Sequence, residues 1–298
     1  MHALHMFVSL YFFDQGGQMM KKAYFFVMFP LILTMFSACG SAGGDVRDNA
    51  DETKTIRIGF TPGPYSNQVK KGIEPSLKEK GYTVEIVEFT NGNEVNFALA
   101  EGSIDADIYQ HTAYFENFVE ENNLDLTETI KVPTAPMGIY SDKYKSLEGI
   151  DKKKTYSIAI PNDPPNIARA LRILEEAKFV QLKDDFEPLT VSTRDIKKYH
   201  VKMKFVEVEQ AQLARVIKDV DFALVNGNYI LASGRELSQS LLLEDPPFEY
   251  QNLIAVRTED KDKQFVKDLL AAYKTDRFQK LIETDPEFKG FWHPDYFK

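Results

Sequence analysis

Residues 156–171 of the chain read YSIAIPNDPPNIARAL, and this stretch decides the fold class. Its first five residues are mostly apolar and β-branched, which predicts a buried strand. The three prolines that follow end the strand, because proline lacks an N–H group and fixes φ. Asn162 and Asp163 are residue types that start turns and cap helices. From Ile167 the apolar spacing becomes helical and extends to about Lys178.

The first turn of this helix carries Arg169. The N–H groups at the start of a helix attract anions, and a cation there is unfavourable unless an anion interacts with it. A guanidinium can bind a carboxylate through two parallel hydrogen bonds. Arg169 is therefore a candidate partner for the carboxylate of a ligand. The alternative is a solvated surface arginine.

The composition excludes some classes of function. The 298 residues are 43% apolar and 27% charged, which is typical of a globular protein with one large or two modest cores. The formal net charge of -9 argues against a nucleic-acid partner, since a phosphate backbone requires a basic face. The single cysteine, Cys39, allows no internal disulfide.

The N-terminal part of the sequence predicts export and lipid attachment. Lys21 and Lys22 precede a short apolar run, which ends in the small residues before Cys39. This pattern predicts a signal peptide over residues 1–38 and resembles a bacterial lipobox, in which the cysteine becomes the lipid-modified N-terminus. A plain signal peptide with an incidental cysteine is the alternative. We expect translation to start at Met19 or Met20, because the residues before them fit a signal peptide poorly.

The remainder of the chain predicts an α/β architecture. Residues 39–54 are small and polar, as expected of a lipidated cysteine followed by a flexible tether. Strands then alternate with helices, which predicts parallel sheets. We expect strands at 55–60, 83–89, 106–111, 129–132, 204–208, 222–225 and 253–257, and helices at 66–80, 113–122, 212–218, 262–273 and 276–284.

Proline-rich extended segments near Pro133 and Pro247 divide this α/β region. They predict two α/β lobes joined by two crossover strands. Lobe 1 comprises residues 55–141 plus 247–298, and lobe 2 comprises residues 142–246. Ligands of such folds lie beyond the carboxyl ends of the strands, which here is a cleft between the lobes.

Polar and aromatic residues follow four of the predicted strands. They offer one guanidinium, several amides, one imidazole and aromatic rings, in residues 61–66, 109–111, 162–169 and 226–229. This set suits a zwitterion with an apolar side chain, because Arg169 would bind a carboxylate and amide oxygens would accept from an ammonium group. Each feature also has a plain alternative: a turn at residues 226–228, a helix-start histidine at His111, and core aromatics at Tyr65 and Tyr109.

No catalytic or metal-binding pattern accompanies these residues. His111, His200 and His293 are far apart and lack the spacing of a zinc site. The nucleophile-elbow and Walker A signatures are absent from the sequence. We therefore expect a protein that is not an enzyme, with no metal and no cofactor.

Five segments of the chain resemble the methionine-binding lipoproteins that serve methionine-type ABC importers. The resemblance extends from Lys21 to about Thr284, and its most specific parts are GFTPGP at 59–64, DADIYQH at 105–111, PMGIYS at 136–141, IPNDPPN at 160–166 and VNGNY at 225–229. It implies a type II periplasmic-binding-protein fold. It also implies a protein anchored by lipid to the extracytoplasmic face of the cell membrane, which delivers an amino acid to a permease and its ATPase.

The resemblance also implies roles for individual residues. Arg169 would bind the ligand carboxylate, Asn166 and Asn228 its polar backbone atoms, and Tyr109 and His111 would line the side-chain pocket. Tyr65 and Asn226 complete the predicted site.

Several positions differ from the family pattern around this pocket: Tyr65 where His is common, Ile108 where an aromatic is common, Tyr109 where Phe is common, Pro165 where Ser is common and Ala168 where Gly is common. Phe36 stands where the lipobox usually has Leu. The expected ligand is thus methionine, another amino acid or a short peptide. An enzyme acting on a small carboxylate and a surface adhesin are the rival interpretations.

Overall fold

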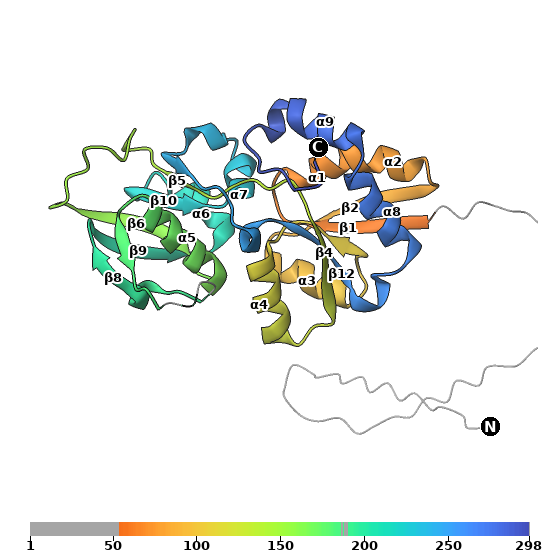
Figure 1. The fold of residues 1–298 in the computed structure, drawn as a ribbon, viewed down its shortest axis with the longest axis horizontal. Helices are drawn as coiled ribbons and strands as arrows, with labels where there is room; N and C mark the ends of the chain where they lie inside the picture. The colour runs from red at the N-terminus through yellow and green to blue at the C-terminus, as the bar shows by residue number, and fades with distance from the viewer. Residues whose placement is uncertain (1–53, 186, 188–189, 298) are drawn as a thin grey trace, which may run out of the picture. The chain divides into compact units, whose positions relative to one another are not determined.

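The computed structural model describes residues 54–297, apart from 186, 188 and 189. These residues lie in a compact unit that begins at Asn49. The predicted signal peptide, Cys39 and the tether up to residue 53 lie outside the described residues. Two five-stranded sheets and a small antiparallel hairpin form the β-structure (Figure 1).

The first sheet has the strand order β2-β1-β3-β12-β4. Its members are β1 (Lys54–Phe60), β2 (Tyr82–Glu88), β3 (Ala106–Asp107), β4 (Leu126–Lys131) and β12 (Leu253–Arg257). β1 pairs in parallel with β2 and β3, whereas β12 is antiparallel to β3 and β4.

The second sheet has the order β11-β5-β10-β6-β9. It comprises β5 (Gly138–Tyr140), β6 (Thr155–Pro161), β9 (Lys202–Val208), β10 (Phe222–Val225) and β11 (Leu242–Leu243). β6 is parallel to β9 and β10, and β5 is antiparallel to β10 and β11.

Both sheets are therefore mixed: the expected parallel pairing holds for three strands of each, and two strands in antiparallel pairings lie beside them. The alternation of strands and helices correctly indicates the parallel centre of each sheet. It does not indicate that the strand expected at 253–257, β12, pairs antiparallel with β3 and β4, because β12 comes from a distant part of the sequence and no single helix joins it to these neighbours.

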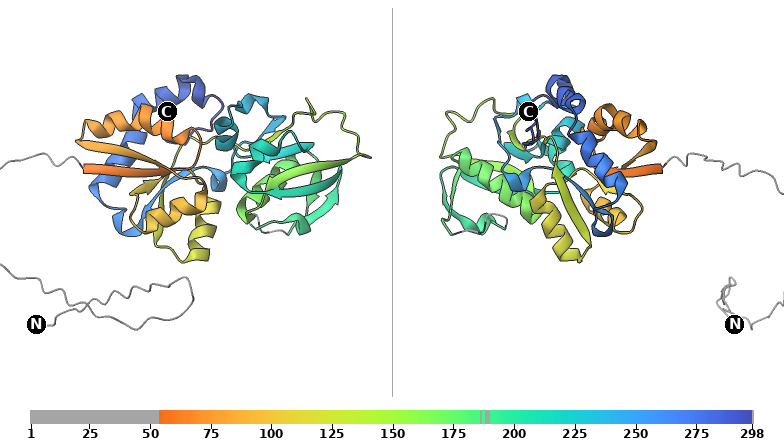
Figure 2. Two further views of the ribbon diagram at one scale, coloured as in Figure 1. Left: turned by 180° about the vertical axis from the view of Figure 1, so that it is seen from behind. Right: turned by 45° about the vertical axis from the view of Figure 1, so that its right-hand side comes forward.

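The α-helices lie between the strands and after β12. They are α1 (Tyr65–Gln68), α2 (Glu74–Lys78), α3 (Gly92–Ala100), α4 (Thr112–Asn122), α5 (Pro164–Glu176), α6 (Gln210–Val216), α7 (Gly227–Ala232), α8 (Gln264–Tyr273) and α9 (Asp276–Thr284). A π-helical turn, Val69–Ile73, joins α1 to α2, where the sequence predicts one regular helix. Figure 2 shows that α5 lies against the sheet that contains β6 and β9.

The chain also contains a short hairpin that the sequence analysis does not anticipate. Its strands are β7 (Val180–Leu182) and β8 (Ile196–Tyr199), which pair antiparallel. Val180 and Leu182 are buried in the same core as Leu171 and Leu174 of α5. The hairpin thus covers the end of α5 and extends the core of the second sheet.

The parallel strands position the polar segments of the chain. β1 and β3 are neighbours in the first sheet, and β6 and β10 are neighbours in the second. The carboxyl ends of parallel neighbours lie at the same edge of a sheet. The residues after β1 and β3 are consequently brought together, as are the residues after β6 and β10.

Candidate functional site

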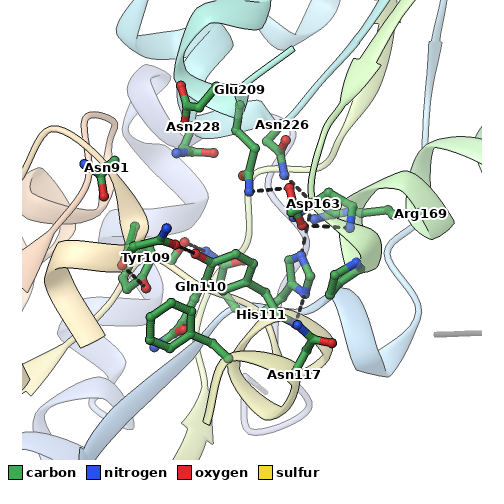
Figure 3. Close-up of a pocket in the computed structure, with 18 of the residues that line it drawn as sticks. Asn91, Tyr109, Gln110, His111, Asn117, Asp163, Arg169, Glu209, Asn226 and Asn228 are labelled. Atoms are coloured by element: carbon green, nitrogen blue, oxygen red, sulfur yellow. Dashed lines mark hydrogen bonds between the residues drawn. The ribbon is translucent and has the colours of Figure 1, made fainter. Parts of the chain in front are cut away.

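A cavity of about 610 Å³ is lined by residues that follow these four strands. All seven residues of the predicted site line it: Tyr65, Tyr109, His111, Asn166, Arg169, Asn226 and Asn228. Figure 3 shows Asn226, Asp163 and His111 converging from separate segments of the chain. Cavities of this size are typical of sites for small molecules.

The start of α5 places two site residues in the wall of the cavity. Asp163 caps the helix, because its Oδ1 accepts from the backbone N–H of Asn166 at 3.1 Å. Pro164 and Pro165 occupy the first two helical positions. The N–H groups at these positions make no hydrogen bond within a helix, so their absence in proline costs nothing there. Asn166 and Arg169 are one turn apart and both are buried.

The side-chain amide of Asn166 is the centre of a hydrogen-bond network. Its Oδ1 accepts from Asn226 Nδ2 at 2.8 Å and lies 3.2 Å from His111 Nε2. Its Nδ2 donates to Asp163 Oδ1 at 2.8 Å, and Gln210 Nε2 donates to Asp163 Oδ2 at 2.7 Å. The network connects residues that follow β3, β6, β9 and β10, so these segments share one set of polar contacts.

His111 is a neutral imidazole with a defined tautomer. It caps α4, and its Nδ1 accepts from the backbone N–H of Tyr114 at 3.2 Å. The proton must therefore be on Nε2, which donates to Asn166. Burial lowers the pKa of His111 well below its usual value, and the positive charge of Arg169 lowers the pKa further.

Asn226 has an oxygen that is available to a ligand. Its Nδ2 is bound to Asn166, but its Oδ1 is buried and accepts no hydrogen bond from the described residues. A buried acceptor without a partner is costly and is uncommon in folded proteins. An N–H donor of a ligand in the cavity would satisfy it.

Arg169 has a protein partner that the sequence analysis does not identify. Its Nε lies 2.9 Å from Glu244 Oε1 and 3.1 Å from Oε2, and its Nη2 also donates to Oε1. Both side chains are buried. Glu244 Oε1 accepts in addition from the backbone N–H of Met137 at 2.6 Å. The guanidinium carbon of Arg169 lies 5.2 Å from the ring centroid of Tyr250.

Tyr65 and Asn228 join the site to the loop after β1. The hydroxyl of Tyr65 accepts from the backbone N–H of Ala135 at 3.2 Å, and burial raises the pKa of this hydroxyl to about 12. Asn228 Nδ2 donates to the carbonyl oxygen of Pro62 at 3.3 Å. A side chain on Gly63 would meet Asn228 Cβ at 2.8 Å, so glycine allows this close approach.

Aromatic rings form one wall of the cavity. Tyr109 donates from its hydroxyl to the carbonyl of Gly92 at 2.7 Å and packs edge-on against Tyr114, with ring centroids 6.3 Å apart. Tyr114 stacks on Phe118, which contacts Phe97. Sequence reasoning missed these last three rings, although the spacing of Tyr114 and Phe118 by one helical turn is a usable signal.

A buried carboxyl group lies behind this wall. Asp107 is fully buried, and burial raises its pKa to about 8. Gln110, which lines the cavity, donates from Nε2 to Asp107 Oδ1 at 2.9 Å and to Asn96 Oδ1 at 2.7 Å. Asn96 donates back to Gln110 Oε1 at 2.9 Å. These bonds fix the orientation of the Gln110 amide.

Metal-ligand clusters and membrane-spanning helices are both absent from the described residues. Within them, no group of His, Cys, Asp and Glu is arranged to hold a metal ion. No helix in the same part of the chain is both long enough and apolar enough to cross a membrane.

The chain resembles known proteins over most of its length. The family model described as NlpA lipoprotein matches residues 56–295. Outer membrane lipoprotein 3 of Mannheimia haemolytica is 31% identical over 92% of this chain and 97% of its own length. D-methionine-binding lipoprotein MetQ of Salmonella typhi is 33% identical over 80% of this chain and 87% of its own length. A solved nutrient-binding protein of Burkholderia cenocepacia bound to methionine has a TM-score of 0.73 and 33% identity, covering 79% of this chain and 97% of that structure.

Proposed function

Because the chain belongs to the NlpA lipoprotein family, we propose that it is the substrate-binding lipoprotein of an ABC importer. It binds L-methionine, a related amino acid or a short peptide, and it delivers this ligand to the permease and its ATPase. The protein is held at the extracytoplasmic face of the cell membrane by lipid on Cys39. Relatives named as methionine-binding lipoproteins support this function.

The observation that carries the proposal is the set of groups in the 610 Å³ cavity. Arg169 supplies a guanidinium for a carboxylate. Asn226 supplies a buried oxygen that has no partner among the described residues, which suits an ammonium group. Tyr109, Tyr114 and Phe118 supply rings for an apolar side chain. An amino acid with an apolar side chain, such as methionine, carries all three of these features.

We further propose that the two sheets are the centres of two lobes joined by two crossover segments. The division follows the expected one, with lobe 1 at residues 55–141 plus 247–298 and lobe 2 at residues 142–246. We move the first boundary to before Gly138, because β5 pairs with β10 and β11 of the second sheet. Ligand binding then shifts the population toward a closed arrangement by hinge bending at the crossovers.

Calorimetry on residues 49–298, a compact unit, tests this function. We expect L-methionine or another amino acid to bind, and Arg169→Ala to weaken binding at least a hundredfold, because a charge-assisted contact to the carboxylate is lost. Arg172→Ala is the matched control, since Arg172 is on the same helix, pairs with Glu249 and does not line the cavity. Unchanged affinity in the Arg169 variant would remove Arg169 from the site.

The same experiment separates the rival interpretations. An enzyme would convert a bound compound, which mass spectrometry of the calorimeter solution would detect. A surface adhesin would bind no amino acid and would instead bind a host macromolecule. Saturable binding without conversion supports the receptor.

A further inference from the structure

Glu244 occupies one edge of the Arg169 guanidinium. The bonds to Glu244 use Nε and one N–H of Nη2, which together form the side edge of the group. Among the described residues the guanidinium donates to Glu244 through Nε and Nη2, so Nη1 and the second N–H of Nη2 keep donors for a ligand. Arg169 lines the 610 Å³ cavity and Glu244 does not, although both residues line a neighbouring cavity.

The pairing cancels the only positive charge among the described residues that line this cavity. His111 is neutral because burial and the nearby Arg169 hold its pKa well below the usual value. The other ionisable side chains with a low reference pKa in the lining are Glu121, Asp163 and Glu209. A ligand that carries only a negative charge therefore meets a neutralised guanidinium and three carboxyl groups.

We infer that Glu244 determines specificity by positioning Arg169 and cancelling its charge. The cavity then accepts a carboxylate only when the same ligand also carries an ammonium group. A zwitterion brings its own positive charge to the acidic lining and to Asn226 Oδ1, whereas a simple carboxylate does not. This inference rests on the proposed function and assigns to Glu244 the discrimination between an amino acid and the corresponding acid without an amine.

The test compares L-methionine with 4-(methylthio)butanoate, which is methionine without its amine. We expect Glu244→Gln to reduce the affinity for L-methionine relative to that for 4-(methylthio)butanoate about tenfold or more. The reason is that the loss of a buried negative charge within a few ångströms of Arg169 strengthens the binding of the simple anion more than that of the zwitterion. Glu244 to Gln conserves the shape and an acceptor for Met137. Calorimetry on residues 49–298 gives both affinities.

Two further variants show whether the charge is responsible. Glu244→Asp retains the charge and should keep the ratio near that of the unaltered protein. Glu249→Gln is the matched control, since Glu249 pairs with Arg172 at 2.8 Å and removing its charge should leave the ratio unchanged. A ratio that shifts with Glu244→Gln alone supports the inference.

The outcomes separate this inference from the proposed function. If Glu244→Gln weakens both ligands equally, Glu244 only supports the fold, and the inference fails while the receptor function stands. If the unaltered protein binds no methionine, the methionine assignment fails and the inference fails with it. If Glu244→Gln does not fold, the affinities of the unaltered protein test the inference instead. Binding of L-methionine less than tenfold tighter than that of 4-(methylthio)butanoate overturns the inference, and a larger difference supports it.

Discussion

Individual side chains in the site differ in how burial affects their charge. Arg169 forms an ion pair with Glu244, His111 stays neutral, and Asp107 retains its proton into the neutral range because burial raises its pKa to about 8. Removing an ionised group from water costs free energy unless a partner compensates for it. Arg169 has such a partner, while His111 and Asp107 avoid the cost by remaining uncharged.

Asp107 gives a prediction for stability against pH. The usual pKa of Asp is near 3.9, so the unfolded chain loses this proton well below the pH at which the folded protein does. The contribution of Asp107 to the folding free energy is therefore most favourable below about pH 4, becomes less favourable as pH rises toward 8, and levels off above it. The penalty at pH 8 is on the order of 5 kcal/mol. The Asp107→Asn variant has no such penalty. The difference in the free energy of unfolding between this variant and the unaltered protein should therefore shift in favour of the variant between pH 4 and pH 8.

Urea denaturation at a series of pH values measures this difference. Asp268→Asn is an informative contrast, because the hydrogen bond from Lys80 is the main cause that lowers the pKa of Asp268. That carboxylate stabilises the folded state above its unfolded pKa, so the variant should lose stability as pH rises through that range. A difference in the free energy of unfolding between Asp107→Asn and the unaltered protein that stays constant from pH 4 to pH 8 would show that the pKa of Asp107 is not raised in the folded state.

At the scale of single elements, α5 connects the fold to the site. Its N-terminal cap, Asp163, also accepts hydrogen bonds from the side chains of Asn166 and Gln210. The same carboxyl group therefore starts the helix and orients the amide that binds His111 and Asn226. A change in the cap of α5 at Asp163 is therefore expected to change the geometry of the site as well.

Replacing this cap should affect both stability and binding. We expect Asp163→Ala to reduce the free energy of unfolding by about 1–2 kcal/mol and to weaken amino-acid binding, because the Asn166 amide loses its support. Thr275→Ala is the control: Thr275 caps α9 through a 3.2 Å bond from the N–H of Phe278, and it does not line the cavity. That variant should lose about 1 kcal/mol of stability and bind normally. Thermal denaturation and calorimetry measure the two effects.

If both variants bind equally well, Asp163 acts as a helix cap alone. The side-chain bonds to Asn166 and Gln210 would then have no part in ligand recognition.

At the scale of the whole molecule, the proposed function requires attachment to a membrane. Cys39 is the only cysteine of the chain and lies outside the described residues. Several fatty-acid chains on one cysteine give stable anchoring that a single chain does not. The relatives named as lipoproteins are consistent with this attachment.

Cell fractionation tests the anchor. We expect the unaltered protein to sediment with membranes after an alkaline wash, and Cys39→Ser to lose this attachment because no thiol remains for lipid. Ser41→Ala, two residues further along, should stay with the membranes. Recovery of the Cys39 variant in the washed membranes to the same extent as the unaltered protein would refute lipid anchoring at this residue.

The sequence by itself determined the local elements of this protein and the residues that end them. The strand Phe222–Val225, the helix Asp276–Thr284 and the turn that starts α5 follow from residue types and spacing within a few positions. The seven predicted site residues line one cavity because each lies shortly after a strand or in the first two turns of the helix after it, and the parallel pairing of the strands aligns these ends.

Only the tertiary structure decided which distant groups meet. Glu244 binds Arg169 across 75 positions of sequence, Asn226 donates to Asn166 across 60 positions, and β12 and β5 add antiparallel strands to the sheets. The physical reason is that local periodicity records which face of an element is buried, but not which element covers it. Which charges pair and which strands pair both depend on which elements cover each other, and this is determined when the whole chain packs.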